Sequence, residues 1–373
     1  ALHPEYHNTG KSPSSSRIFP LSIVAERDTP MGMGRLLQFL VDTTLRLPAP
    51  LLIRLSGAPQ RELAHRQLLP EFQFLDAQMS RAPGLESMEP REARAMFRDQ
   101  PISLEAPLSN PPKTRDHSVN VRGGAISVRE YVPTGITGDL PALVYFHGGG
   151  WVIGDLDSHD SLCARLCAGA GVRVFSADYR LAPEFKFPTP LDDCDAAFEW
   201  ILENTNALKV DPSRIAAGGD SAGGNLTAAL CLRRKSEAKT LPYLQLLLYP
   251  VTDLNLATGS AEDCAEGPVL TLAAMHWFRG HYLNSAEEWD NPLVSPLLAT
   301  NLSGLPSAIV ITAGFDPLRD EGDAYAERLT TAGVPVFHHS YDAFIHGFAN
   351  MSRISDARIA VDEIAEKLAQ KLA

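Results

Sequence analysis

From residue 117 onward, strand-like and helix-like segments alternate along this chain of 373 residues. Short apolar runs rich in valine, isoleucine, leucine and phenylalanine are separated for the most part by segments with helical periodicity. The eight runs lie at 117–122, 125–132, 142–146, 172–177, 214–218, 244–249, 308–312 and 334–341. The first two meet at Gly123-Gly124, which predicts an opening β-hairpin. The alternation of the other runs with helices predicts an α/β fold, with a mostly parallel eight-stranded sheet covered by helices on both faces.

A glycine-rich segment, Gly219-Asp220-Ser221-Ala222-Gly223-Gly224, directly follows the apolar run at 214–218 and precedes a helix-like segment. Gly-x-Ser-x-Gly in this setting indicates a sharp strand-to-helix turn that exposes a nucleophilic serine. Small residues must flank the serine because the turn strains its backbone. The pattern alone is also compatible with a glycine-rich turn that caps a helix. The candidate nucleophile, Ser221, therefore needs chemical partners elsewhere in the chain.

A second glycine run, His147-Gly148-Gly149-Gly150-Trp151, follows the strand-like residues 142–146. When a serine attacks a carbonyl carbon, negative charge develops on the oxygen, and each preorganised N–H donor there contributes roughly 3–4 kcal/mol. Glycines let backbone amides approach a substrate because no Cβ intervenes. We therefore expect an oxyanion hole formed by the amides of Gly148, Gly149 and Ala222. His147 is expected to fix this loop rather than to act as a base.

A serine hydroxyl needs a histidine to accept its proton and a carboxylate to orient that histidine, in the chain order serine, acid, histidine. Asp316 follows the strand-like run at 308–312 through a short Ala-Gly-Phe link. His346 follows the run at 334–341 and precedes a glycine. We predict Ser221, Asp316 and His346 as a catalytic triad.

Other acids and histidines are weaker candidates for these roles. Asp253 also follows a strand-like run, and Asp316 could instead be the N-cap of a helix that opens at Pro317. The acids Asp320, Glu321 and Asp323 are expected to form the negatively charged first turn of that helix. The remaining rivals for the base, His338 and His339, are placed on the strand itself.

Composition indicates the surroundings of the protein. The net charge of −12 argues against binding to nucleic acid or to anionic membrane surfaces. We see no stretch of about 20 apolar residues and no signal-peptide pattern at the N-terminus, and we expect a cytoplasmic protein without stable membrane insertion. The five cysteines lack C-x-x-C spacing and are expected to be buried and reduced. No metal site and no cofactor are predicted.

Two segments lie outside the alternating pattern: residues 1–110, and residues 255–299 between the sixth and seventh strands. We predict a main catalytic domain at 111–373, with both segments contributing to a mainly helical cap. The second segment is rich in apolar and aromatic side chains, which suit either a lid over the site or packing of the cap onto the body: Leu270, Leu272, Met275, Trp277, Phe278 and Tyr282. The apolar residues 36–53 are compatible with a cap helix, a dimer contact or a weak lipid-surface element.

Taken together, the His-Gly-Gly-Gly-Trp, Gly-Asp-Ser-Ala-Gly-Gly, Asp-Pro-Leu-Arg-Asp-Glu and His-Gly-Phe motifs at 147, 219, 316 and 346 resemble those of the hormone-sensitive-lipase family of α/β-hydrolases. The resemblance spans about residues 117–372. It implies an α/β-hydrolase fold and a serine carboxylesterase that acts on short-to-medium acyl esters, a small-molecule substrate. It also makes a homodimer through the strand at 334–341 plausible.

Two other classes of function stay open. A peptidase or amidase on the same scaffold would carry an identical triad, and only a comparison of matched ester and amide substrates separates it from an esterase. A non-catalytic small-molecule receptor is the fate of relatives that have lost a triad residue, whereas this chain retains all three candidates.

Overall fold

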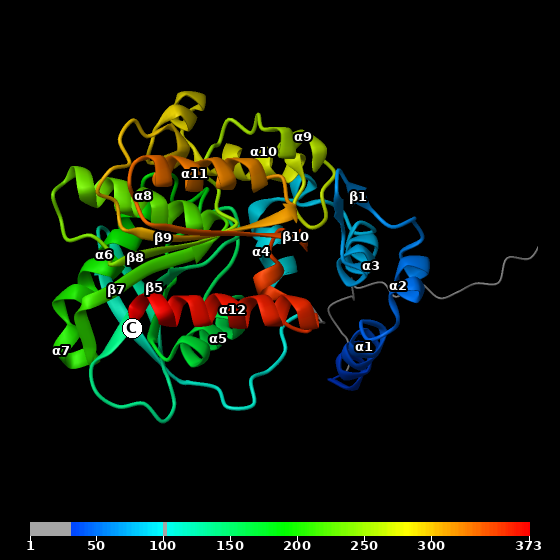
Figure 1. Ribbon diagram of the computed structural model, residues 1–373, viewed down its shortest axis with the longest axis horizontal. Coiled ribbons are helices and arrows are strands. Elements are labelled where there is room, and N and C mark those ends of the chain that lie inside the picture. The colour runs from blue at the N-terminus through cyan, green and yellow to red at the C-terminus, as the bar shows by residue number, and fades with distance from the viewer. Residues whose placement is uncertain (1–30, 100–102) are drawn as a thin grey trace, which may run out of the picture.

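The computed structural model describes residues 31–99 and 103–373 (Figure 1). Residues 1–30 and 100–102 of the predicted N-terminal segment lie outside the described part. The expectation about a signal peptide concerns the first of these ranges and is therefore not tested.

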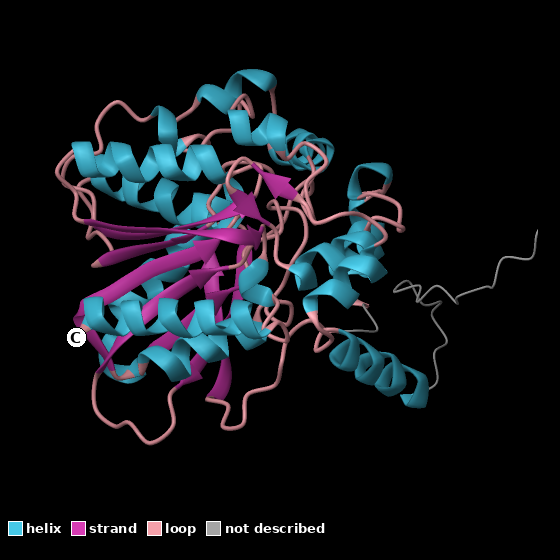
Figure 2. Ribbon diagram, turned by 45° about the vertical axis from the view of Figure 1, so that its right-hand side comes forward, coloured by secondary structure: helices cyan, strands magenta, loops and turns pink. Residues whose placement is uncertain are grey.

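A single twisted sheet of eight strands runs through the middle of the main domain (Figure 2). Its strand order is β10-β9-β8-β7-β5-β6-β4-β3. The neighbours from β10 to β6 are parallel, while β4 pairs antiparallel with both β6 and β3. The strands are β3 (Lys113–Val121), β4 (Gly124–Val132), β5 (Leu140–Phe146), β6 (Arg173–Ala177), β7 (Val210–Asp220), β8 (Leu244–Leu248), β9 (Ser307–Phe315) and β10 (Val336–Ile345). The predicted mostly parallel sheet and its opening hairpin are confirmed.

Helices cover both faces of this sheet (Figure 1). One face carries α5 (Asp160–Ala170) and α12 (Ser355–Leu372), and the other carries α6 (Thr189–Glu203), α8 (Ala222–Ser236) and α11 (Arg319–Thr331). A four-residue helix, α7 (Thr205–Leu208), leads into β7. One side of α12 is buried against the body of the protein, in Ala357, Val361, Ile364, Leu368 and Leu372. All five cysteines are buried as expected.

The two segments outside the alternation are mainly helical. The N-terminal segment contains α1 (Met31–Thr44), α2 (Ala49–Ser56), β1 (Glu62–Leu63), β2 (Arg66–Gln67), α3 (Pro70–Met79), the 3₁₀ turn η1 (Leu85–Ser87) and α4 (Pro90–Arg98). The insertion after β8 contains α9 (Gly259–Asp263), α10 (Leu272–Tyr282) and the 3₁₀ turns η2 (Ala286–Asp290) and η3 (Pro296–Leu298), and a last turn, η4 (Phe348–Asn350), follows β10. The two segments touch, since the indole Nε1 of Trp277 donates to the carbonyl oxygen of Met88 at 3.2 Å. Their joint role as a cap stays a prediction.

Two further features bear on the predicted surroundings and partners. Within the described ranges, no single helix has the length and apolarity of a membrane span; α1 and α2 pass that test only as a pair, which bends by 119°. Strand β10 is the edge of the sheet, as a dimer through 334–341 requires, and the dimer itself stays a prediction.

The turn from β7 into α8 is packed tightly against the neighbouring strand β5. A Cβ added at Gly223, in the first turn of α8, would collide with the backbone carbonyl of Phe146 at the end of β5. We expect Gly223→Ala to lower the free energy of unfolding by about 1–3 kcal/mol, because backbone cannot move aside as a flexible side chain can. Urea denaturation followed by circular dichroism measures the change.

A helical glycine with free space around it provides the control. Gly280 in α10 has no atom within 4 Å of an added Cβ. Gly280→Ala should leave the stability unchanged or raise it by up to about 1 kcal/mol, because alanine is the better helix former. Equal effects of the two substitutions would contradict the close approach of α8 to β5.

Candidate active site

Ser221 occupies the turn between β7 and α8 in a backbone conformation that side chains rarely adopt, with φ 54° and ψ −117°. A serine there is strained by about 1–3 kcal/mol. Its amide donates to the carbonyl oxygen of Leu248 at 2.8 Å, which ties the turn to the end of β8. The predicted strand-to-helix turn is thus present, and it holds Ser221 beyond the carboxyl end of the parallel strands, where ligands bind in open α/β sheets.

The three predicted triad residues lie within hydrogen-bonding distance of one another. The Nε2 atom of His346 is 3.0 Å from the Oγ atom of Ser221, and its Nδ1 atom is 2.8 Å from Oδ2 of Asp316. Asp316 is fully buried, and His346 is 7% exposed. Each residue follows the end of a strand, so the sheet brings together groups that are up to 125 positions apart in the sequence. A carboxylate bonded to Nδ1 fixes the tautomer in which Nε2 can accept the serine proton.

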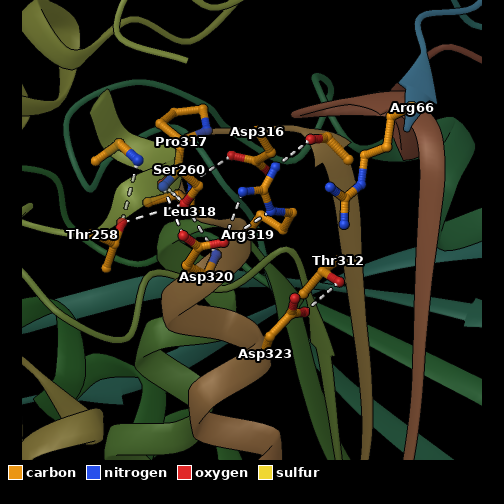
Figure 3. A network of polar contacts seen from close by, with 12 residues as sticks. Arg66, Thr258, Ser260, Thr312, Asp316, Pro317, Leu318, Arg319, Asp320 and Asp323 are labelled. Atoms are coloured by element: carbon orange, nitrogen blue, oxygen red, sulfur yellow. Dashed lines mark hydrogen bonds and ion pairs between the residues drawn. The ribbon is translucent and has the colours of Figure 1, made fainter. Parts of the chain in front are cut away.

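Asp316 also shapes the start of the following helix. Its second oxygen, Oδ1, accepts the amide of Leu318 at 2.8 Å, and α11 begins at Arg319. The sequence-based start at Pro317 is therefore wrong by two residues, because Asp316 first closes a turn. Figure 3 shows this corner, where Arg319 and Asp320 extend the polar network toward Ser260. Asp316 thus uses one carboxylate oxygen to close the turn and the other to hold His346.

The rival acids are committed to other partners. The Oδ1 atom of Asp253 accepts the backbone amide and the side-chain nitrogen of Asn255, each at 2.9 Å. Glu321 is fully buried in the first turn of α11, where it accepts the amides of Thr252 and Asp253 at 2.7 and 3.1 Å. Asp323 bonds Thr312 and His338. Among the described side chains, only Asp316 forms a hydrogen bond with the Nδ1 atom of His346.

The predicted oxyanion donors need one correction, at Gly148. Its amide donates to Oδ1 of Asp220 at 2.9 Å in a buried setting, so it is not available to a substrate. The amides of Gly149, Gly150 and Ala222 make no hydrogen bond to any described residue. Gly149 and Gly150 have φ values of 105° and 57°, which favour glycine at both positions. The free amides beside the serine turn are therefore those of Gly149, Gly150 and Ala222.

A buried acid that the sequence analysis did not single out as a site residue holds this glycine loop in place. Besides the Gly148 amide, Oδ1 of Asp220 accepts the hydroxyl of Tyr145 at 2.8 Å, and Oδ2 lies 3.3 Å from Nε2 of His159. Burial opposes ionisation of Asp220, yet His159 and Tyr145 hold its pKa below the usual value. Because Asp220 precedes Ser221, the same residue fixes the nucleophile turn and the glycine loop. The only sign of this role in the sequence is that the charged residue Asp220 directly precedes the candidate nucleophile.

His147 has the structural role predicted for it. It is fully buried, its ring stacks on Tyr179 at 4.3 Å, and its Nδ1 atom lies 2.7 Å from the carbonyl oxygen of Gly148. Burial and the neighbouring His159 lower the pKa of His147 to about 4, so its imidazole is neutral near pH 7. The Tyr179 hydroxyl donates to the His147 carbonyl at 2.7 Å and holds the loop from its other side.

The insertion packs directly on the glycine loop. The ring of Phe278 in α10 fills the space that a Cβ at Gly150 would need. Tyr282 stacks on Trp151 with ring centroids 4.2 Å apart and the planes nearly parallel. For these two aromatic residues, packing of the insertion onto the body is the observed role, which was one of the two open interpretations.

Comparison with known proteins places the chain in a family. A model of the α/β hydrolase fold family matches residues 143–350. Carboxylic ester hydrolase LipN of Mycobacterium tuberculosis is 43% identical over 251 residues, which cover 66% of this chain and 66% of LipN. Ethyl acetate hydrolase of Pseudomonas putida is 36% identical over 293 residues, or 77% of this chain and 92% of that protein.

Solved structures agree with these relatives. An α/β hydrolase enzyme from the metagenome of Lake Arreo superposes with a TM-score of 0.77 at 39% identity, covering 81% of this chain and 98% of that one. A thermostable esterase from Pseudomonas putida has a TM-score of 0.77 at 34% identity, with 81% and 96% covered. The chain therefore belongs to the α/β hydrolase fold family and is, within it, a carboxylic ester hydrolase of the hormone-sensitive-lipase type.

Proposed function

We propose that the chain is a serine carboxylesterase that cleaves short-to-medium-chain esters through an acyl-enzyme, with Ser221 as nucleophile, His346 as base and Asp316 as the acid that orients it. The observation that carries the proposal is the unbroken hydrogen-bonded series from the Ser221 Oγ through the two ring nitrogens of His346 to Asp316. One relative, from Pseudomonas putida, is named ethyl acetate hydrolase, which supports a preference for small esters. No cofactor takes part in the proposed reaction.

The proposed reaction has two halves. Ser221 attacks the ester carbonyl carbon while His346 takes its proton, and Asp316 stabilises the imidazolium that forms. The amides of Gly149, Gly150 and Ala222 stabilise the oxyanion. Collapse expels the alcohol, which His346 protonates. The same histidine then removes a proton from a water molecule that attacks the acyl carbon. When the bond to Ser221 breaks, His346 returns this proton to the Ser221 Oγ and the acid leaves.

We extend the proposal to the two segments outside the sheet alternation. The N-terminal segment and the insertion act together as a cap beside this site, as supported by the bond between Trp277 and Met88 and by the contact of Phe278 with the glycine loop. Arg94 in α4 adds a second link, because it donates to the carbonyl oxygen of Val152 at 2.7 Å and forms an ion pair with Glu184. A cytoplasmic location and a homodimer stay predictions from the sequence.

Substitution of the triad tests the proposal. We expect wild-type protein to hydrolyse p-nitrophenyl esters with a maximum at short or medium acyl chains. Ser221→Ala should lower kcat by about 10⁶-fold, and Asp316→Asn by about 10⁴-fold, because each removes a member of one concerted unit. Initial rates across esters from acetate to palmitate provide the measurement.

Asp253→Asn is the matched control, since it makes the same chemical change in an acid whose side chain accepts hydrogen bonds from Asn255. It should retain wild-type rates. Undiminished activity in folded Ser221→Ala would refute the serine mechanism. Faster cleavage of a matched amide than of the ester would favour the amidase alternative, and no turnover of either substrate would favour a receptor.

Asp220 provides a separate test of the glycine loop. Asp220→Ala removes the acceptor for the Gly148 amide, so the neighbouring free amides lose their fixed orientation. We expect kcat to fall by about 10²-fold, in the range of losing one oxyanion donor, with KM changed by less than about threefold. Steady-state kinetics with p-nitrophenyl acetate separate the two parameters.

Tyr145→Phe is the control, because it removes one bond to Asp220 but leaves the bond between Asp220 and the Gly148 amide. Its effect on kcat should be much smaller. If Asp220→Ala instead raised KM and left kcat intact, Asp220 would not position the oxyanion donors. Circular dichroism establishes that both variants fold.

A further inference from the structure

Helices α1 and α2 present large apolar side chains to solvent. Nine such side chains are exposed in the part of the chain that the structure describes, and five of them belong to these two helices. They are Leu36, Phe39, Leu40, Leu51 and Leu55, with exposed fractions from 38% to 65%. Both helices lie at one end of the molecule, where they protrude beyond the sheet and its covering helices (Figure 1). We call these five side chains the N-terminal apolar face.

Packing within the protein does not account for this face. On α1, Val41 already enters the hydrophobic core, as do Leu45 just after that helix and Leu52 on α2. A surface helix of a globular protein normally carries one apolar stripe toward the core and polar side chains opposite it. These helices carry apolar side chains on the opposite side as well, which indicates a second apolar environment.

The segment that carries the face has a net charge opposite in sign to that of the whole protein. The chain has a net charge of −12, yet residues 31–57 contain three arginines and one acid. That acid, Asp42, is paired with Arg353 at 2.8 Å. Arg35, Arg46 and Arg54 are exposed and form no ion pair with any described residue. The overall charge thus hides a local cationic surface beside exposed leucine and phenylalanine side chains.

We propose that the N-terminal apolar face, with these three arginines, binds an anionic phospholipid surface. Leucine and phenylalanine side chains enter the boundary between head groups and acyl chains, while arginines attract the lipid phosphates. The 119° bend between the two helices suits attachment along a surface rather than passage through it. This revises, for one corner of the molecule, the expectation that net charge alone excludes anionic membranes.

A second copy of the chain fits the face less well. A symmetric dimer brings the same patch of both subunits together, so six arginines with no acid other than the paired Asp42 of each subunit would gather in one interface. Such an arrangement places like charges in contact, which is unfavourable. An anionic lipid surface satisfies the apolar side chains and the arginines at once.

The segment that carries the N-terminal apolar face contacts the active-site end of the sheet through β2 and α3. Arg66 pairs with Asp342 at 2.9 Å, and the rings of Phe72 and Phe344 meet with centroids 5.4 Å apart. Asp342 and Phe344 belong to β10, the strand that ends immediately before His346. Binding through α1 and α2 would therefore hold the catalytic domain at the lipid surface. The inference stands whether or not the proposed ester preference is correct.

Vesicle co-sedimentation of the full chain tests the proposal. Vesicles of phosphatidylcholine alone are compared with vesicles of phosphatidylcholine and phosphatidylglycerol in equal parts. We expect binding to the anionic vesicles only, weakened by added salt. A triple variant, Arg35→Gln, Arg46→Gln and Arg54→Gln, should lower the partition coefficient about fivefold for each arginine removed. Phe39→Ser with Leu51→Ser should also abolish detectable binding.

The matched control replaces exposed apolar residues elsewhere, Ile136→Ser with Ile359→Ser, which are 44% and 51% exposed in the native chain. This control should bind like wild type, and all variants should retain hydrolysis of a soluble p-nitrophenyl ester as evidence of folding. Failure of the wild type to sediment with anionic vesicles would overturn the proposal, as would equal binding by all variants. Loss of a dimer in Phe39→Ser with Leu51→Ser, measured by light scattering without lipid, would assign the face to a second copy.

Discussion

The left-handed backbone of Ser221 is the constraint on which the rest of the site depends. A non-glycine residue at φ 54° and ψ −117° persists only where its surroundings hold it. Three contacts do so here. The Ser221 amide is bonded to Leu248 on β8, Gly223 lies against the carbonyl of Phe146 on β5, and Asp220 joins Gly148. The nucleophile is therefore fixed to both strands that flank β7, and the sheet supplies the energy that keeps the turn strained.

Asp220 links this turn to the group of amides that would stabilise the oxyanion. A carboxylate that is almost fully buried costs free energy unless hydrogen bonds satisfy its oxygens. Tyr145, Gly148 and His159 provide these partners, and the cost of breaking any of them keeps the network in one arrangement. The geometry between Ser221 and the free amides is then set by the protein interior, before any substrate arrives.

Site residues could be predicted from the sequence where their role depends on their position at the end of a strand. They could not be predicted where the role depends on which atoms already form hydrogen bonds in the folded protein. Each strand before a triad residue contains an apolar run, so Ser221, Asp316 and His346 could be predicted to meet. The predicted ends at 218, 312 and 341 nevertheless fall two to four residues short of the ends of β7, β9 and β10. The choice between Gly148 and Gly150 could not be made, because it depends on a bond to Asp220 that only the folded sheet creates. The helix start at Arg319 was missed for the same reason, since Asp316 uses one oxygen for the turn and the other for His346.

The distribution of charge carries information that the net charge conceals. Apart from Asp42, the acids of this protein lie outside residues 31–57, and Asp42 is neutralised by Arg353. Electrostatic attraction is screened over about 8–10 Å at physiological salt, so a surface responds to the charges near it and hardly to those across the molecule. A chain with a charge of −12 can therefore present a cationic, apolar end to an anionic surface while its acidic body stays away from it. Because that end is anchored to the strand that precedes His346, attachment and chemistry would act on the same side of one rigid sheet.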